Sequence, residues 1–112
     1  MSLDFELTIE ADVGNKDPYV AEIFSSIYIN SVIPMWKKAG VYDCLYKSSG
    51  KQAKSIVGKL ELGIQEMINY KEDYIKLNPK NGWGEYYSAL EFLKEVCENC
   101  KKYPKSIIFS DV

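Results

Sequence analysis

The sequence contains no histidine and no arginine, so all fourteen of its basic residues are lysines. Histidine is the usual general base near neutral pH and the commonest nitrogen ligand of metals. Arginine is the side chain that usually binds carboxylates, phosphates and guanine through two parallel hydrogen bonds, whereas lysine offers only a point charge. These absences exclude a standard serine–histidine–aspartate triad and argue against bidentate anion recognition.

Long apolar runs are also missing. The first ten residues, MSLDFELTIE, carry acids at positions 4 and 6, where a secretion signal would be basic and then apolar. The most apolar window, SSIYINSVIPMW, is interrupted by Asn30, Ser31 and Pro34, which makes it too short and too polar to span a bilayer. Three cysteines, an odd number, favour a reducing compartment. We expect a cytoplasmic protein with no membrane partner.

The charge balance predicts no nucleic-acid partner. The net charge is −2 and the isoelectric point is about 5.2. The lysines are spread along the chain and interleaved with acids. A nucleic-acid interface is typically a clustered basic stripe on a domain of high isoelectric point.

The 112 residues, 46% of them hydrophobic, are enough for one modest core, and we expect a single domain over 1–112. Residues 3–10 alternate apolar and polar side chains, which is the pattern of a half-buried strand. The stretch ADVGNKDP predicts a turn, and YVAEIF at 19–24 predicts a second strand, so the chain begins with a hairpin. KSIIFSD near the end predicts a closing strand.

Helical patterns fill the middle of the chain. Residues 30–47 predict a helix that Gly40 breaks, with Pro34 in its first turn. An apolar face with three-and-four spacing predicts a helix over 52–70, in which Gly58 and Gly63 suggest close approach of a neighbouring backbone. A further helical piece follows, and the last helix runs from about Gly84 to Lys102. The pattern predicts an α+β fold, with a small sheet of about three strands (the N-terminal hairpin plus the C-terminal strand) packed against three to four helices.

Cys97 and Cys100 form a CxxC motif in the last predicted helix. They lie near its C-terminus, where the helix dipole disfavours thiolates, and they continue its apolar seam. A closed zinc site needs four ligands, and the chain offers three cysteines. We interpret the thiols as buried and inert, with no metal site and no cofactor. Glu91, Glu95 and Glu98 are interpreted as an exposed helical face.

Residues 78–86, NPKNGWGEY, admit two interpretations. In the first, Pro79 ends one helix, Asn81 caps the next, and the glycines let Trp83 fold over a structural hinge. In the second, Asn30, Asn81, Trp83 and Tyr86 line a polar pocket that binds a small ligand.

The same stretch, with MWKKAGVYDCLY at 35–46 and the final IIFSD, resembles a family of small bacterial and phage-borne proteins of unknown activity. Its members carry MAxxAGxYxxLW and then NxxNGWGxY. Here the first motif is matched by Met35, Ala39, Gly40, Tyr42 and Leu45, with Tyr46 in place of the tryptophan, and the second by Asn78, Asn81, Gly82, Trp83, Gly84 and Tyr86. The likeness covers about the last two thirds of the chain. The family usually has NITHN before the first helix, whereas residues 27–31 read IYINS. The resemblance implies a compact α+β build and a link to phage or mobile elements.

The sequence therefore favours a non-catalytic binding or accessory module of prophage origin. No catalytic residue is assigned. The abundance of tyrosine suits a protein partner or a homodimer. The alternative is a small-ligand-binding protein or minor enzyme that uses the pocket near Asn81 and Trp83.

Overall fold

The structure is a computed structural model that describes residues 3–12, 14, 16–17, 19–28, 32–77 and 82–112, and it omits the side chains of 82–84. It confirms the α+β class, with the strands β1 (Leu3–Ala11), β2 (Tyr19–Tyr28) and β3 (Ile107–Asp111). The helices are α1 (Ile33–Ala39), α2 (Tyr42–Tyr46), α3 (Lys54–Asn69), α4 (Lys71–Ile75) and α5 (Gly82–Lys102).

The three strands form one antiparallel sheet in the order β2-β1-β3. The predicted alternation in β1 is confirmed from Leu3 to Leu7, because Leu3, Phe5 and Leu7 are all buried on one face, whereas Ile9 is exposed. Leu7 pairs with Phe24 whereas Thr8 pairs with Glu22, so Ile23 is the extra residue of a β-bulge. A bulge bends its strand and increases the local twist.

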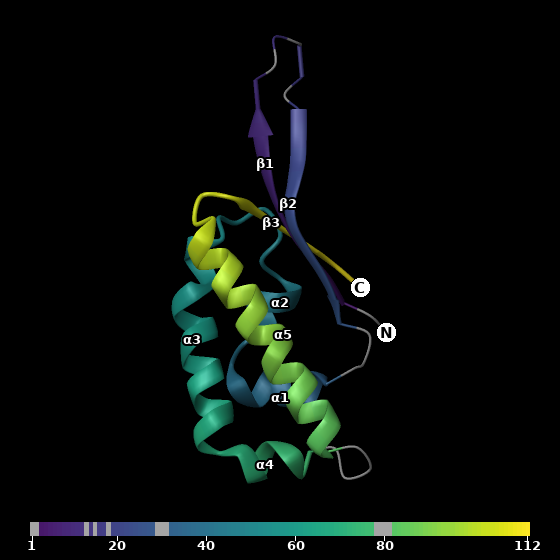
Figure 1. Ribbon diagram of the computed structural model, residues 1–112, viewed down its shortest axis with the longest axis vertical. Helices are drawn as coiled ribbons and strands as arrows, with labels where there is room; N and C mark the ends of the chain where they lie inside the picture. Colours follow the sequence, from purple (N-terminus) through teal and green to yellow (C-terminus); the bar gives the residue numbers. More distant parts are fainter. Residues whose placement is uncertain (1–2, 13, 15, 18, 29–31, 78–81) are drawn as a thin grey trace.

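The hairpin of β1 and β2 continues beyond the helices, as Figure 1 shows. The third strand pairs with β1 only from Asp4 to Thr8, so the outer part of the hairpin is two-stranded. The molecule is therefore elongated, with extents of 54 × 25 × 18 Å.

The helical layer covers one face of the sheet (Figure 1). The break at Gly40 is confirmed, because that residue has a left-handed φ of 76° and ends α1. The described residues form five helices rather than three or four, since Gly40 and the irregular Tyr70 separate the short α2 and α4 from their neighbours. Asn30 and Ser31, the first residues of the helix predicted over 30–47, lie outside the described residues. Among the described helices, none has the length and apolar character that crossing a bilayer requires.

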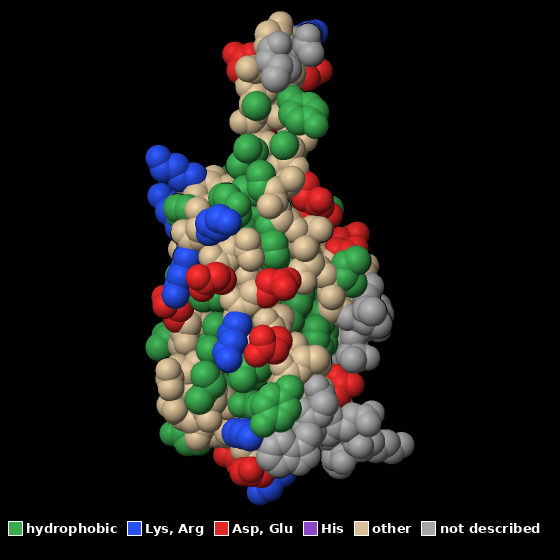
Figure 2. Space-filling model, in the orientation of Figure 1, with side chains coloured by type: hydrophobic (Ala, Val, Ile, Leu, Met, Phe, Trp, Pro, Cys, Tyr) green, Lys and Arg blue, Asp and Glu red, His purple; other side chains and the backbone are tan. Residues whose placement is uncertain are grey.

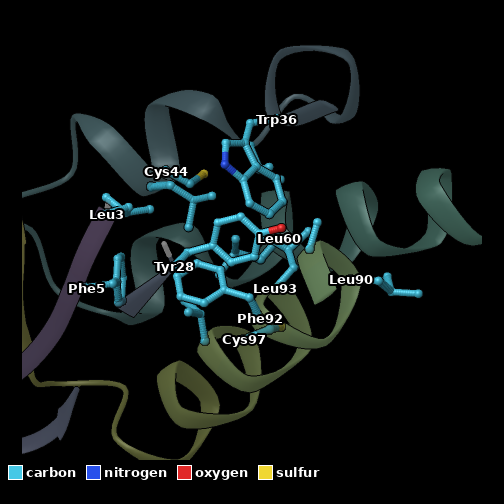
Figure 3. Packing of buried hydrophobic residues seen from close by; sticks show 14 of the residues in the cluster. Leu3, Phe5, Tyr28, Trp36, Cys44, Leu60, Leu90, Phe92, Leu93 and Cys97 are labelled. Carbon is cyan, nitrogen blue, oxygen red and sulfur yellow. The ribbon is translucent and has the colours of Figure 1, made fainter. Parts of the chain in front are cut away.

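An aromatic cluster joins the sheet to the helices (Figure 3). The ring of Tyr28, at the end of β2, lies 5.2 Å from the ring of Phe92 on α5 and 5.6 Å from that of Trp36 on α1, measured between centroids. The Tyr28–Trp36 contact is edge-on, a preferred geometry for aromatic pairs. This cluster attaches the lower end of β2 to α5.

The two glycines of α3 differ in their surroundings. A Cβ built on Gly63 would lie 2.4 Å from Val41 Cγ1 and 3.1 Å from the Ala39 carbonyl oxygen, whereas one on Gly58 meets nothing within 4 Å. The close approach predicted from the sequence is therefore confirmed at Gly63 and wrong at Gly58.

We expect Gly63→Ala to destabilise the protein and Gly58→Ala to stabilise it. Both gain roughly 1 kcal/mol of helix propensity. At Gly63 the overpacking, typically about 1–3 kcal/mol, outweighs that gain, because Val41 is fully buried and stiff at χ1. Urea unfolding of the two variants measures the difference. Equal stabilisation of both would show that α3 does not pack against the α1–α2 junction as described.

Candidate functional site

The two edges of the sheet differ in whether another segment of the described chain covers them. The outer edge of β3 is covered by residues 49–53. The Gly50 amide donates to the Ile108 carbonyl at 2.8 Å, and the Ile108 amide donates to the Lys51 carbonyl at 2.9 Å. The Ala53 amide donates to the Ser106 carbonyl at 2.8 Å. This edge is therefore closed to other strands.

The outer edge of β2 is open, because no strand in the described part of the chain pairs with it. Natural sheets protect such edges with lysine, proline or a covering segment, since an unpaired row of amides and carbonyls can recruit another strand. Along its ten residues β2 has only one charged side chain, Glu22, and its sole irregularity is the bulge at Ile23. Ile27 is 61% exposed beside this edge.

A groove of about 550 Å³ runs between the lower half of β2 and α5. One side is formed by Ser26, Ile27 and Tyr28, and the rings of Tyr28 and Phe92 are in van der Waals range of each other. The α5 side is polar and contributes Ser88, Glu91, Lys94, Glu95 and Glu98.

The helical period places these polar residues beside the groove. The apolar seam of α5, which includes Leu93 and Val96, is buried in the core. The charged residues Lys94 and Glu95, which lie between these two in the sequence, are exposed at the edge of the seam. Figure 2 shows carboxylate and lysine side chains gathered over this helix. The Glu91 carboxylate lies 3.8 Å from the Lys94 ammonium. Three carboxylates against one lysine leave the groove negatively charged.

A hydrogen-bonded group occupies the end of the groove where α5 begins. The Tyr28 hydroxyl lies 2.9 Å from Ser88 Oγ, and it donates to the Glu85 backbone carbonyl at 3.4 Å. Burial raises the pKa of Tyr28, so the phenol stays protonated at neutral pH. The arrangement places two hydroxyl groups and an aromatic surface at this end of the groove.

Of the four residues predicted to line a polar pocket, the structure places one side chain. Asn30 and Asn81 lie outside the described residues. Trp83 is in the first turn of α5, and its side chain is not among those that the structure describes. Tyr86 is buried in the core and its hydroxyl donates to the Met67 carbonyl at 2.7 Å. Tyr86 thus ties α5 to the end of α3, and the pocket itself stays a prediction.

The three cysteines are free thiols, and all are buried, as predicted for Cys97 and Cys100. Burial is the main cause that raises the pKa of Cys100 to about 12. In the region that the structure covers, no three potential ligands among histidine, cysteine, aspartate and glutamate come together in a way that could hold a metal ion.

Sequence reasoning missed the groove. The glutamates of α5 were interpreted as a solvated face, and the strand prediction ended at residue 24, before the segment that lines the groove. The signal that could have found it is the uncharged stretch SSIY at 25–28, directly after the predicted strand.

Comparison of the chain with protein-family models, with curated proteins and with solved structures finds no match. The likeness to the phage-borne family therefore stays a prediction.

We expect the stability of the protein to fall in alkaline solution partly through Cys100. Its folded-state pKa of about 12 exceeds the ordinary value of 9.0, so its contribution is complete below pH 9 and is lost as the pH rises toward 12. Each pH unit in that window costs roughly 1.4 kcal/mol per thiol.

Urea unfolding of the wild type and of Cys100→Ala, measured from pH 8 to pH 10.5, isolates this contribution. The wild type should lose about 2 kcal/mol more than the variant over that range. Parallel pH profiles would mean that the thiol is not buried as described.

Proposed function

We propose that the protein is a non-catalytic binding module that accepts an extended, lysine- or arginine-bearing segment of a partner protein as a fourth strand on β2. The observation that carries this proposal is the open, nearly uncharged edge of β2 with a groove and a helix beside it. Strand addition of this kind is a recurrent mode of peptide recognition, in which main-chain hydrogen bonds give affinity and side-chain contacts give specificity.

The geometry suits an extended chain. A strand added to β2 would lie about 4.7–4.9 Å from it, and its successive side chains would point to opposite faces of the sheet. On the inner face those side chains would enter the groove, beside Phe92 and the row of glutamates on α5. Every second side chain of the partner would therefore meet carboxylates.

Charge complementarity defines the partner. Glu91, Glu95 and Glu98 outnumber Lys94 along the groove wall, so a basic side chain is favoured there and an acidic one is repelled. Exposed ion pairs contribute modestly, about 0.2–1 kcal/mol each, so the charges select the partner and the backbone ladder holds it. An accessory role in the cytoplasm, with a prophage origin, is part of the same proposal.

The probe is a fluorescein-labelled peptide with blocked ends that alternates valine and lysine over seven residues. We expect its fluorescence anisotropy to rise on binding and the affinity to fall with salt. The triple variant Glu91→Gln/Glu95→Gln/Glu98→Gln should weaken binding about tenfold, the sum of three exposed charge contacts. A matched control, Glu61→Gln/Glu72→Gln/Asp73→Asn, removes the same charge outside the groove and should bind as the wild type does.

Backbone methylation separates strand addition from simple charge attraction. In a strand, the amides of alternate residues point to the same side. Methylation of either the valine amides or the lysine amides should therefore abolish binding, whereas methylation of the other set should leave it. If both methylated peptides bind like the parent, no ladder forms on β2 and the proposal is wrong.

A further inference from the structure

The charges of this chain are segregated far more than its net charge suggests. Residues 3–28 contain six acids and one lysine, whereas residues 33–60 contain six lysines and one acid, Asp43. The expectation that lysines are interleaved with acids therefore holds only for the remainder of the chain. The hairpin carries a net charge of −5 and the stretch from α1 into α3 carries +5.

Four lysines of that stretch lie around Tyr42 or line the hollows beside it. The ammonium groups of Lys37 and Lys47 lie 5.1 and 5.8 Å from the centre of the Tyr42 ring, which stacks on Tyr46. Two adjoining hollows, of about 250 and 100 Å³, meet at Asp43 and Lys59. The larger includes Lys37 and the smaller includes Lys51. We call Lys37, Lys47, Lys51 and Lys59 with Tyr42 the basic surface.

The outer hairpin has the complementary character. Beyond Thr8 it is two-stranded, and we call residues 9–12 and 19–22 with the described tip residues Gly14, Lys16 and Asp17 the arm. Ile9, Tyr19 and Val20 are 42%, 61% and 54% exposed on it. Its acids are Glu10, Asp12, Asp17 and Glu22. Figure 2 shows acidic side chains at the tip with apolar ones below them.

Such an arm is an unusual feature for an isolated chain. A two-stranded hairpin is marginal in water by itself, and exposed apolar side chains rimmed by charges mark interaction sites. The arm projects away from the helices that could cover it (Figure 1). Its acids and apolar groups match a basic surface that presents lysines and an aromatic ring.

We infer that the arm of one copy docks on the basic surface of the next copy, so that the protein assembles head to tail. This inference goes beyond the proposed function and uses other surfaces, because the groove lies along the lower half of β2. The two contacting surfaces are different, so the interface is heterologous and generates rings or open chains rather than a two-fold dimer.

Nucleic acid fits the basic surface less well. Phosphate backbones are typically bound by a clustered stripe of arginine and lysine on a basic domain, and this chain has no arginine and a net charge of −2. A second copy brings an arm with four acids and one lysine, a net charge of −3 that is opposite in sign to the +5 of the lysine-rich stretch. The acidic arm of one copy and the basic surface of another therefore attract each other at long range.

Complementary variants test the inference by sedimentation velocity at low salt. The arm variant is Asp12→Lys/Asp17→Lys/Tyr19→Ser, and the surface variant is Lys37→Glu/Lys51→Glu/Lys59→Glu. All six side chains are exposed, and thermal melts confirm that each variant is folded. A control, Lys76→Glu/Lys102→Glu/Lys105→Glu, makes the same change of charge as the surface variant at other positions.

We expect the wild type and the control to form species larger than a monomer at high concentration and to dissociate when salt shortens the range of electrostatic attraction. Each interface variant should be monomeric alone. Mixed in equal amounts, they should form a one-to-one dimer and nothing larger, because the intact arm of one fits the intact basic surface of the other.

A wild type that stays monomeric at low salt overturns the inference, as does a mixture that contains only monomers. Binding of a DNA duplex that the surface variant loses, without self-assembly, would assign the basic surface to nucleic acid instead. Peptide binding in the groove should be unchanged in the surface variant, so failure of head-to-tail assembly and failure of strand addition are separate results.

Discussion

The burial of one face of β1 is the interaction on which the remaining structure depends. Leu3, Phe5 and Leu7 are each at most 1% exposed, and they hold the central strand of the sheet against the helical layer. A central strand needs a neighbour on each side, and β2 and β3 fill those positions. The sheet therefore has two edges, and the described helices cover one of its faces.

The two edges differ because different segments of the chain lie beside them. Residues 49–53, which precede α3, run along β3 and close its edge with backbone hydrogen bonds. On the other side α5 contacts β2 at Tyr28, through the ring of Phe92 and the hydrogen bonds to Ser88 and Glu85, and a groove lies beside this contact. The same packing that fixes the lower end of β2 thus leaves its outer edge open.

Local patterns of the sequence predicted the elements well. The alternation over residues 3–7, the break at Gly40 and the seam of the last helix each depend on neighbouring residues, and each is present in the structure. The strand β2 was predicted too short because Ser25 and Ser26 have little strand propensity alone. Pairing with Glu6 and Phe5 extends it, which is a tertiary effect.

The candidate site was harder to predict because it joins distant segments. Tyr28 and Ser88 are sixty positions apart, and no periodicity shows that α5 passes beside the edge of β2. Helical spacing correctly placed Glu91 and Glu95 at the surface, but it could not show that this surface forms one side of the groove beside β2. The segregation of charge between hairpin and helices was visible in the sequence, although its meaning depends on the projecting arm.

Residue-resolved amide hydrogen exchange of the dilute protein in high salt tests the central claim most directly, because self-association is suppressed there. With an open edge, alternate amides of β2 lack a partner and exchange rapidly, while every amide of β1 from Asp4 to Leu7 is protected by a neighbouring strand on one side or the other. Uniform protection of all β2 amides at the level of β1 would contradict the account, because it would mean that the edge is already covered.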